Sequence, residues 1–270
     1  MELFNSQFRE KPTTSIGFIE EIAVTIAAQN LTPTIVSQDF LQFSGIIPQD
    51  WKLAQQPVLN PALAQLTFQN GITILAQPGT ISISESVGNK MFKELQVPHI
   101  ATKYVEKLPH AEYVGLSNSP KIIVPFPGNP EAVPQYMTQK LLAQGSWQEI
   151  GTGILQAGVN LVYLLDRCQL NITINQVKLQ SPQQSRESPG MSNGMAHSSP
   201  YIAALLFSGN FNYNIATDTL QQPVNQLIQS INYWQTDFNV FREIVTQKFL
   251  AEANLEQFTP QESVFPIGAV

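Results

Sequence analysis

Two glycine-containing turns between short alternating stretches constrain the fold of this 270-residue chain more than any other feature. Asn70-Gly71 and Pro78-Gly79 separate three predicted strands, over residues 63–69, 72–77 and 80–85. Asn-Gly is the preferred pair for a tight hairpin turn. Because connections this short cannot cross over to a parallel strand, the sequence predicts an antiparallel sheet.

The same alternation predicts how these strands pair. In the second hairpin Ile74 should face Ile83, which puts both on one apolar face together with Ala76. In the first hairpin a two-residue turn would place Ile74 opposite Thr67, and Leu66 would then lie on the other face. We therefore expect either a different register there or partial cover on both faces of the sheet.

Further elements are predicted along the rest of the chain. Apolar runs and period-two alternation predict strands at 20–27, 113–116, 122–126, 158–166, 170–179 and 201–215. Between residues 36 and 51 the pattern is irregular, with room for a short helix. Apolar stripes and helix-start signals such as Asn129-Pro130 predict helices at 98–108, 129–143 and 220–250.

The order of these elements predicts an α+β fold, with a mostly antiparallel sheet and helices on one face. Both halves follow the order β-meander then helix, so we expect two similar halves, 19–150 and 151–252, ending in a long C-terminal helix. Residues 180–200 contain no Leu, Ile, Val or aromatic side chain, and we expect a mobile loop there. A flexible N-terminus is expected over 1–18 and a tail over 253–270.

The strongest pattern lies in the predicted C-terminal helix. Apolar residues recur there at alternating spacings of four and three, which makes a seam of period 3.5: Leu220, Val224, Leu227, Ile231, Trp234, Phe238, Phe241 and Val245. We expect the central aromatic residues to pack on the protein's own sheet. The ends of the seam, Val224 and Leu227 on one side and Val245 and Phe249 on the other, are candidate interface residues of a homodimer. The alternatives are that the tail or the other half of the chain covers them.

Composition and charge argue against several classes of function. Charged residues make up 13% of the chain, about half the usual share, and the net charge is -6. The fourteen basic residues are scattered, so nucleic-acid binding is not expected. The single cysteine permits no internal disulfide, the N-terminus has no secretory pattern, and no stretch approaches the roughly 18 apolar residues of a membrane span. We therefore expect a soluble cytoplasmic protein.

Recognisable catalytic and cofactor-binding motifs are missing. Gly151-Thr152-Gly153 lacks the spacing and the preceding strand of a dinucleotide site. The three histidines have no metal-ligand spacing, and Cys168 is typical of a small core residue, so no metal or cofactor is expected. An enzyme would need a site assembled from distant residues. The polar candidates near the ends of predicted elements are Asp166, Arg167, His110 and Tyr113.

Four short stretches resemble uncharacterised cyanobacterial proteins: FSGIIP at 43–48, LAQP at 75–78, LLDRC at 164–168 and FSGNF at 207–211. The order of elements is also similar to that of a sporadically distributed bacterial family of unknown function. Neither resemblance implies a catalytic residue. With catalytic motifs missing, we expect a non-enzymatic protein-binding or assembly protein; the alternative is an enzyme or a small-ligand-binding protein with a non-local site.

Overall fold

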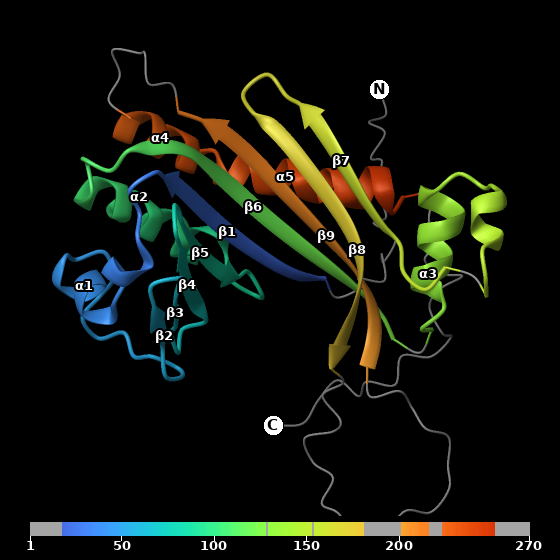
Figure 1. The fold of residues 1–270 in the computed structure, drawn as a ribbon, viewed down its shortest axis with the longest axis horizontal. Coiled ribbons are helices and arrows are strands. Elements are labelled where there is room, and N and C mark those ends of the chain that lie inside the picture. The colour runs from blue at the N-terminus through green and yellow to red at the C-terminus, as the bar shows by residue number, and fades with distance from the viewer. Residues whose placement is uncertain (1–17, 128, 153, 181–200, 216–222, 252–270) are drawn as a thin grey trace, which may run out of the picture.

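The structure of the chain, a computed structural model, describes residues 18–127, 129–152, 154–180, 201–215 and 223–251. These described residues include nine strands, which form one antiparallel sheet in the order β2-β3-β4-β5-β1-β6-β9-β8-β7 (Figure 1). The predicted α+β class and antiparallel sheet are confirmed. The strands are β1 (Ile19–Ala28), β2 (Val58–Asn60), β3 (Leu63–Thr67), β4 (Ile72–Gln77), β5 (Thr80–Ser86), β6 (Tyr113–Phe126), β7 (Gly158–Leu164), β8 (Gln169–Gln180) and β9 (Tyr201–Asn214).

Helices pack on one face of this sheet. Phe241 of α5 lies over Gly209 of β9, and Asn118 of β6 bonds to residues of both α4 and α5. In Figure 1, α4 and α5 run behind the long strands β6, β9 and β8. The helices are α1 (Gln38–Phe43), α2 (Val97–Lys107), α3 (Ala132–Tyr136), α4 (Pro223–Asn232) and α5 (Trp234–Glu243), with π-helical turns η3 (Met137–Leu141) and η6 (Ile244–Phe249) and short 3₁₀ turns η1 (Pro33–Ile35), η2 (Phe92–Glu94) and η4 (Ser146–Glu149).

The two predicted hairpins differ in how well their registers were predicted. In β4 and β5, Ile74 faces Ile83 as expected. In β3 and β4, Ile74 faces Leu66. A two-residue turn would have paired Ile74 with Thr67, so the register differs from that prediction by one residue. The amide of Phe68 donates to the carbonyl of Ile72, so the turn contains three residues. Gly71 closes it with φ +85°, a backbone conformation that suits glycine. Because the turn contains this extra residue, Leu66 lies on the core face of the sheet.

The interior strand β6 was predicted as two shorter strands, and that was wrong. Its polar stretch at 117–120 stays in the sheet because β1 pairs with all four residues on one side and β9 pairs with Ser117 and Asn118 on the other. β6 thereby joins the segments 19–150 and 151–252 into one sheet with one continuous core. The similarity of these two halves stays a prediction.

The C-terminal seam forms consecutive helical segments instead of one uninterrupted helix. α4, α5 and η6 follow one another, with a break between α4 and α5 at Tyr233. The central seam residues Ile231, Phe238 and Phe241 are fully buried, whereas Trp234 is partly buried against the core. The ring of Phe241 lies on Gly209 of β9, so the predicted packing on the protein's own sheet is confirmed for this residue. Arg242 of α5 also binds Glu20 of β1 through two hydrogen bonds of 2.8 and 2.6 Å.

Three predicted segments lie outside the described residues: the N-terminus up to residue 17, the loop 181–200 and the tail 253–270. His197 and Leu220 lie in the undescribed parts as well. Within the described ranges, no helix has the length and hydropathy needed to cross a membrane.

Candidate functional site

The two edges of the sheet are built differently. β2 forms one edge, is only three residues long, and lies between Pro57 and Pro61. Short strands and prolines are common ways in which proteins prevent edge strands from pairing with other chains. β7 forms the opposite edge, has seven residues and contains neither proline nor a charged residue. It is the outermost strand on its side of the sheet (Figure 1).

The hydrogen bonding of β7 leaves one set of backbone groups without a partner strand. Leu165 donates its amide to the carbonyl of Cys168 at the β7–β8 turn. Because bonded and non-bonded positions alternate in an antiparallel pair, Val159, Leu161 and Tyr163 bond to β8. The other residues of the strand direct their amides and carbonyls away from the sheet: Gly158, Asn160, Val162 and Leu164. Among the described residues, none is recorded bonding to these groups.

The side chains along this edge are apolar and exposed. Leu164 is 91% exposed and Val162 56%, and Tyr163 is also exposed. The segment that leads into the strand adds Leu155, which is 97% exposed, and Ile150. An exposed apolar edge strand without charge is typical of a site where another strand adds to the sheet.

A buried polar cluster fixes the hairpin that carries this edge. Arg167, in the β7–β8 turn, donates from Nη2 to Oδ1 of Asp237 on α5 and from Nε to the hydroxyl of Tyr213 at 3.2 Å. The hydroxyl of Tyr213 and the side-chain amide of Asn118 each donate to Oδ2 of Asp237 at 2.8 Å. The guanidinium also lies 5.4 Å from the ring centre of Tyr233. The turn is thereby attached to the helical layer.

The electrostatics of the cluster indicate a structural role for it. Burial raises the pKa of Tyr213, so its hydroxyl remains a donor. Burial alone would lower the pKa of Arg167, but its hydrogen bonds to Asp237 and Tyr213 raise it, so the cation persists. Burial likewise raises the pKa of the Cys168 thiol, which opposes the thiolate form that a nucleophile requires. Tyr213 and Cys168 therefore stay protonated, and Arg167 stays cationic.

The four polar candidates from the sequence do not form one site. Arg167 joins the buried cluster, whereas Asp166 lies beside it in the turn without an ion pair among the described residues. Tyr113 donates its hydroxyl to the carbonyl of Leu108, and burial raises its pKa. His110 lies in the turn between α2 and β6. No hydrogen bond within the described ranges links His110 or Tyr113 to the other two.

The four candidate interface residues all contact the protein's own core. Leu227 and Val245 are fully buried within the single chain, and Val224 and Phe249 are partly buried against the core. The ring of Phe249 lies 5.8 Å from that of Phe207. The sheet and the elements packed beside it therefore bury much of the apolar seam. Their role in a dimer stays a prediction.

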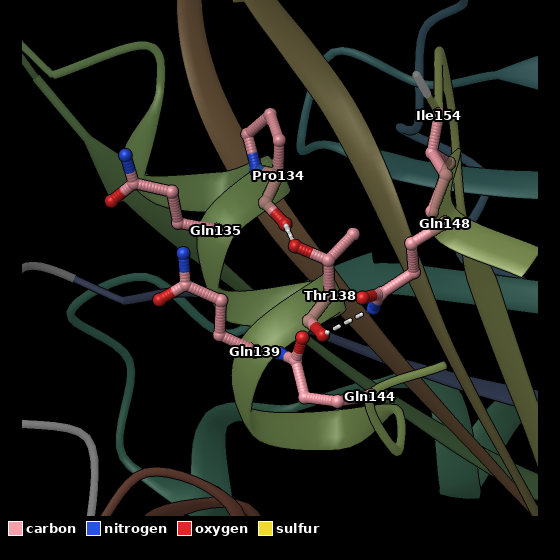
Figure 2. Close-up of a pocket in the computed structure, with 7 residues that line it drawn as sticks. All are labelled: Pro134, Gln135, Thr138, Gln139, Gln144, Gln148 and Ile154. Carbon is pink, nitrogen blue, oxygen red and sulfur yellow. Dashed lines mark hydrogen bonds between the residues drawn. The ribbon is translucent and has the colours of Figure 1, made fainter. Parts of the chain in front are cut away.

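A pocket of about 400 Å³ beside α3 is lined mainly by amides (Figure 2). The amide of Gln148 donates to the carbonyl of Thr138, and the Thr138 hydroxyl donates to the carbonyl of Pro134. The lining consists of Pro134, Gln135, Thr138, Gln139, Gln144, Gln148 and Ile154. None of these side chains ionises near neutral pH, so the pocket supplies no general acid or base.

A second groove, of about 580 Å³, lies between α3 and the ends of β8 and β9. Its walls include Val133, Leu155 and Tyr201, with Lys178 as its one cationic side chain. A nucleophile, a general base and an oxyanion site do not come together there. Among the described residues, no three His, Cys, Asp or Glu side chains are placed to hold a metal ion.

The cluster of Asp237, Tyr213 and Asn118 was not predicted from the sequence. One signal was present: Asp237 lies three residues after Trp234 and four before Phe241, on the apolar stripe of its helix. A carboxylate at such a position must be buried and therefore needs partners. The partners come from β6, β9 and the β7–β8 turn, and no local pattern identifies them.

No protein-family model matches this chain, and no curated protein is detectably similar to it.

Proposed function

We propose that this chain is a non-enzymatic cytoplasmic protein that binds other proteins, with an assembly or accessory role, and that it binds them by strand addition at β7. The observation that supports the proposal best is the β7 edge, whose outward amides and carbonyls have no strand beside them within the described part of the chain. An extended segment placed there would gain main-chain hydrogen bonds along a strand about 23 Å long.

Two further features support strand addition. The hairpin is fixed by the contact of Arg167 with Asp237, so the edge is ordered before a partner arrives. Pre-ordering lowers the conformational entropy lost on binding. The low charge of the chain, 13% charged residues, suits recognition through backbone and apolar contacts rather than through electrostatic steering.

Photo-crosslinking in cells tests this proposal directly. A photo-reactive phenylalanine analogue replaces Val162 on the β7 edge, and in a matched control it replaces Leu59 on the β2 edge, which is similarly exposed. We expect discrete crosslinked products from position 162 and none from position 59, because β2 is short and lies between prolines.

A second change shows whether main-chain pairing carries the contact. Asn160→Pro removes an outward amide without removing a bond to β8. Added to the position 162 variant, it should strongly reduce the crosslinked products while the circular dichroism spectrum stays unchanged. Equal crosslinking from positions 162 and 59, or no crosslinking from either, would contradict the proposed function.

A further inference from the structure

We infer that the strand added at β7 is β7 of a second copy of this chain, paired antiparallel about a twofold axis at Leu161. This inference rests on the proposed function and names the partner at the same edge. It moves the expected homodimer contact from the C-terminal seam, where Leu227 and Val245 are buried, to the free edge of the sheet.

The register follows from the length of the strand. Leu161 is the middle residue of Gly158–Leu164, so an axis there pairs all seven residues of both copies. Asn160 then faces Val162 of the second copy, and both are positions with outward amides and carbonyls. Every outward backbone group of the strand gains a partner, and Leu161 forms the central non-bonded pair.

This register also keeps each side chain on the correct face. Val159, Leu161 and Tyr163 lie opposite the core residues Ile174, Ile172 and Leu170 of β8, so they share the helix-covered face. Pairing about Leu161 places Val159 opposite Tyr163 of the second copy. An aromatic residue opposite a β-branched residue is a favourable cross-strand pair. The apolar layer thus continues from one copy into the other.

On the other face of the sheet, the absence of a side chain at Gly158 fits the same register. A β-carbon there would lie 2.8 Å from Oδ1 of Asn175, so a larger residue would require the Asn175 side chain to move. In the proposed register Gly158 faces Leu164 of the second copy, which is 91% exposed in the single chain. The missing side chain leaves room for that leucine to lie flat across the pair.

The charge pattern favours self-pairing as well. The strand itself is uncharged, and the nearest charged residues, Asp166 and Arg167, follow it directly. These two lie in the β7–β8 turn, beyond the paired residues 158–164, so the pairing brings no charged residue opposite another. A twofold contact also closes on itself, because one pairing covers the free edges of both copies.

Because the contact is small, we expect the two copies to bind each other weakly. A single strand pair lies at the low end of specific interfaces, below about 1,200 Å², so we expect a reversible dimer with a Kd in the micromolar range. Sedimentation equilibrium of the purified full chain from about 1 to 200 μM should show the mass rise from one chain to two across this range.

Charge substitutions at the edge test where the dimer forms. Val162→Lys and Val162→Glu should each remain monomeric, because two like charges would lie diagonally across the pair. Mixing the two variants should restore the dimer. The matched control, Leu59→Lys on the β2 edge, should dimerise like the parent. Both positions are exposed, so circular dichroism should show all variants folded.

A cysteine tests the register. Central non-bonded pairs bring α-carbons to about 4.5 Å, within disulfide range, so Leu161→Cys should give a covalent dimer under mild oxidation. The parent chain, whose single Cys168 is buried, should not. A parent that stays monomeric at about 200 μM, or a Val162→Lys variant that still dimerises, would overturn the inference. If position 162 still crosslinks to a different protein in cells, the proposed function stands without the second copy.

Discussion

Replacing Asp237 by alanine should destabilise the chain more than any change to a surface ion pair. The carboxylate of Asp237 is fully buried and accepts hydrogen bonds from Arg167, Tyr213 and Asn118. Removing it leaves the Tyr213 hydroxyl and one amide hydrogen of Asn118 without an acceptor. Each buried donor left without a partner costs about 1–3 kcal/mol.

The arginine adds a smaller contribution. Its side chain is 32% exposed, so water can solvate the guanidinium after the carboxylate is lost. The two unpaired donors and the partly solvated guanidinium together should lower the free energy of unfolding by about 4 kcal/mol, which is within the range for broken buried ion pairs. Glu21→Ala is the control, because its pair with Lys121 has side chains 38% and 41% exposed and should contribute about 0–1 kcal/mol.

Urea denaturation measures both variants against the parent. We expect the midpoint to fall sharply for Asp237→Ala and hardly at all for Glu21→Ala, with unchanged slopes. Asp237→Leu combined with Arg167→Met and Tyr213→Phe should recover part of the loss, because one amide hydrogen of Asn118 is then the only donor of the cluster left without an acceptor. Equal losses from Asp237→Ala and Glu21→Ala would refute the view that this carboxylate organises the cluster.

Three more predictions concern other parts of the core. Gly209→Ala should lower the melting temperature, at a cost of about 1–3 kcal/mol, since a β-carbon would lie 2.7 Å from the ring of Phe241; an unchanged melting temperature would contradict this packing. Burial raises the pKa of Tyr136 to about 12, and its hydroxyl donates to the carbonyl of Phe249. An unfolded tyrosine ionises near pH 10, so the unfolded chain loses this proton first and stability falls as the pH rises from about 10 to 12. Tyr136→Phe should make that fall shallower in urea midpoints measured across this range, and identical slopes would count against it. Glu85→Ala should lower hydrogen-exchange protection in the first turn of α2, because the buried carboxylate of Glu85 accepts the backbone amides at the start of that helix; unchanged protection would rule this role out.

The sequence predicted those parts of the fold that short-range patterns determine. The strand β1, the hairpin of β4 and β5 and the helix α2 were placed to within a few residues, because alternation and turn residues are local signals. The register of β3 was not predicted, because the turn that ends at Gly71 contains one more residue than its Asn-Gly pair suggests.

Pairing between residues far apart in the chain explains the remaining differences between the predicted and the observed fold. The stretch 117–120 of β6 has the composition of a loop, yet it pairs with β1 throughout and with β9 at Ser117 and Asn118, and this pairing overrides the local preference. The side chains of Ser117 and Ser119 bond there to Asn212 and Asn210 of β9. Such cross-strand partners are more than ninety residues away in the chain, so no local pattern shows them.

The candidate site shows the same division between local and long-range information. The sequence shows directly that residues 158–164 are apolar and uncharged, but not that they end the sheet. That position depends on β8 pairing with β9 on its other side, which leaves β7 with a single neighbour. It also depends on the contact of Arg167 with Asp237, which connects the turn to a helix seventy residues later. An uncharged strand buried on both sides would need no explanation, whereas the same strand at an ordered edge exposes unpaired backbone groups. Because the buried cluster orders this edge, a partner strand would meet a surface that is already formed, and this connects the stability of the core to the proposed binding.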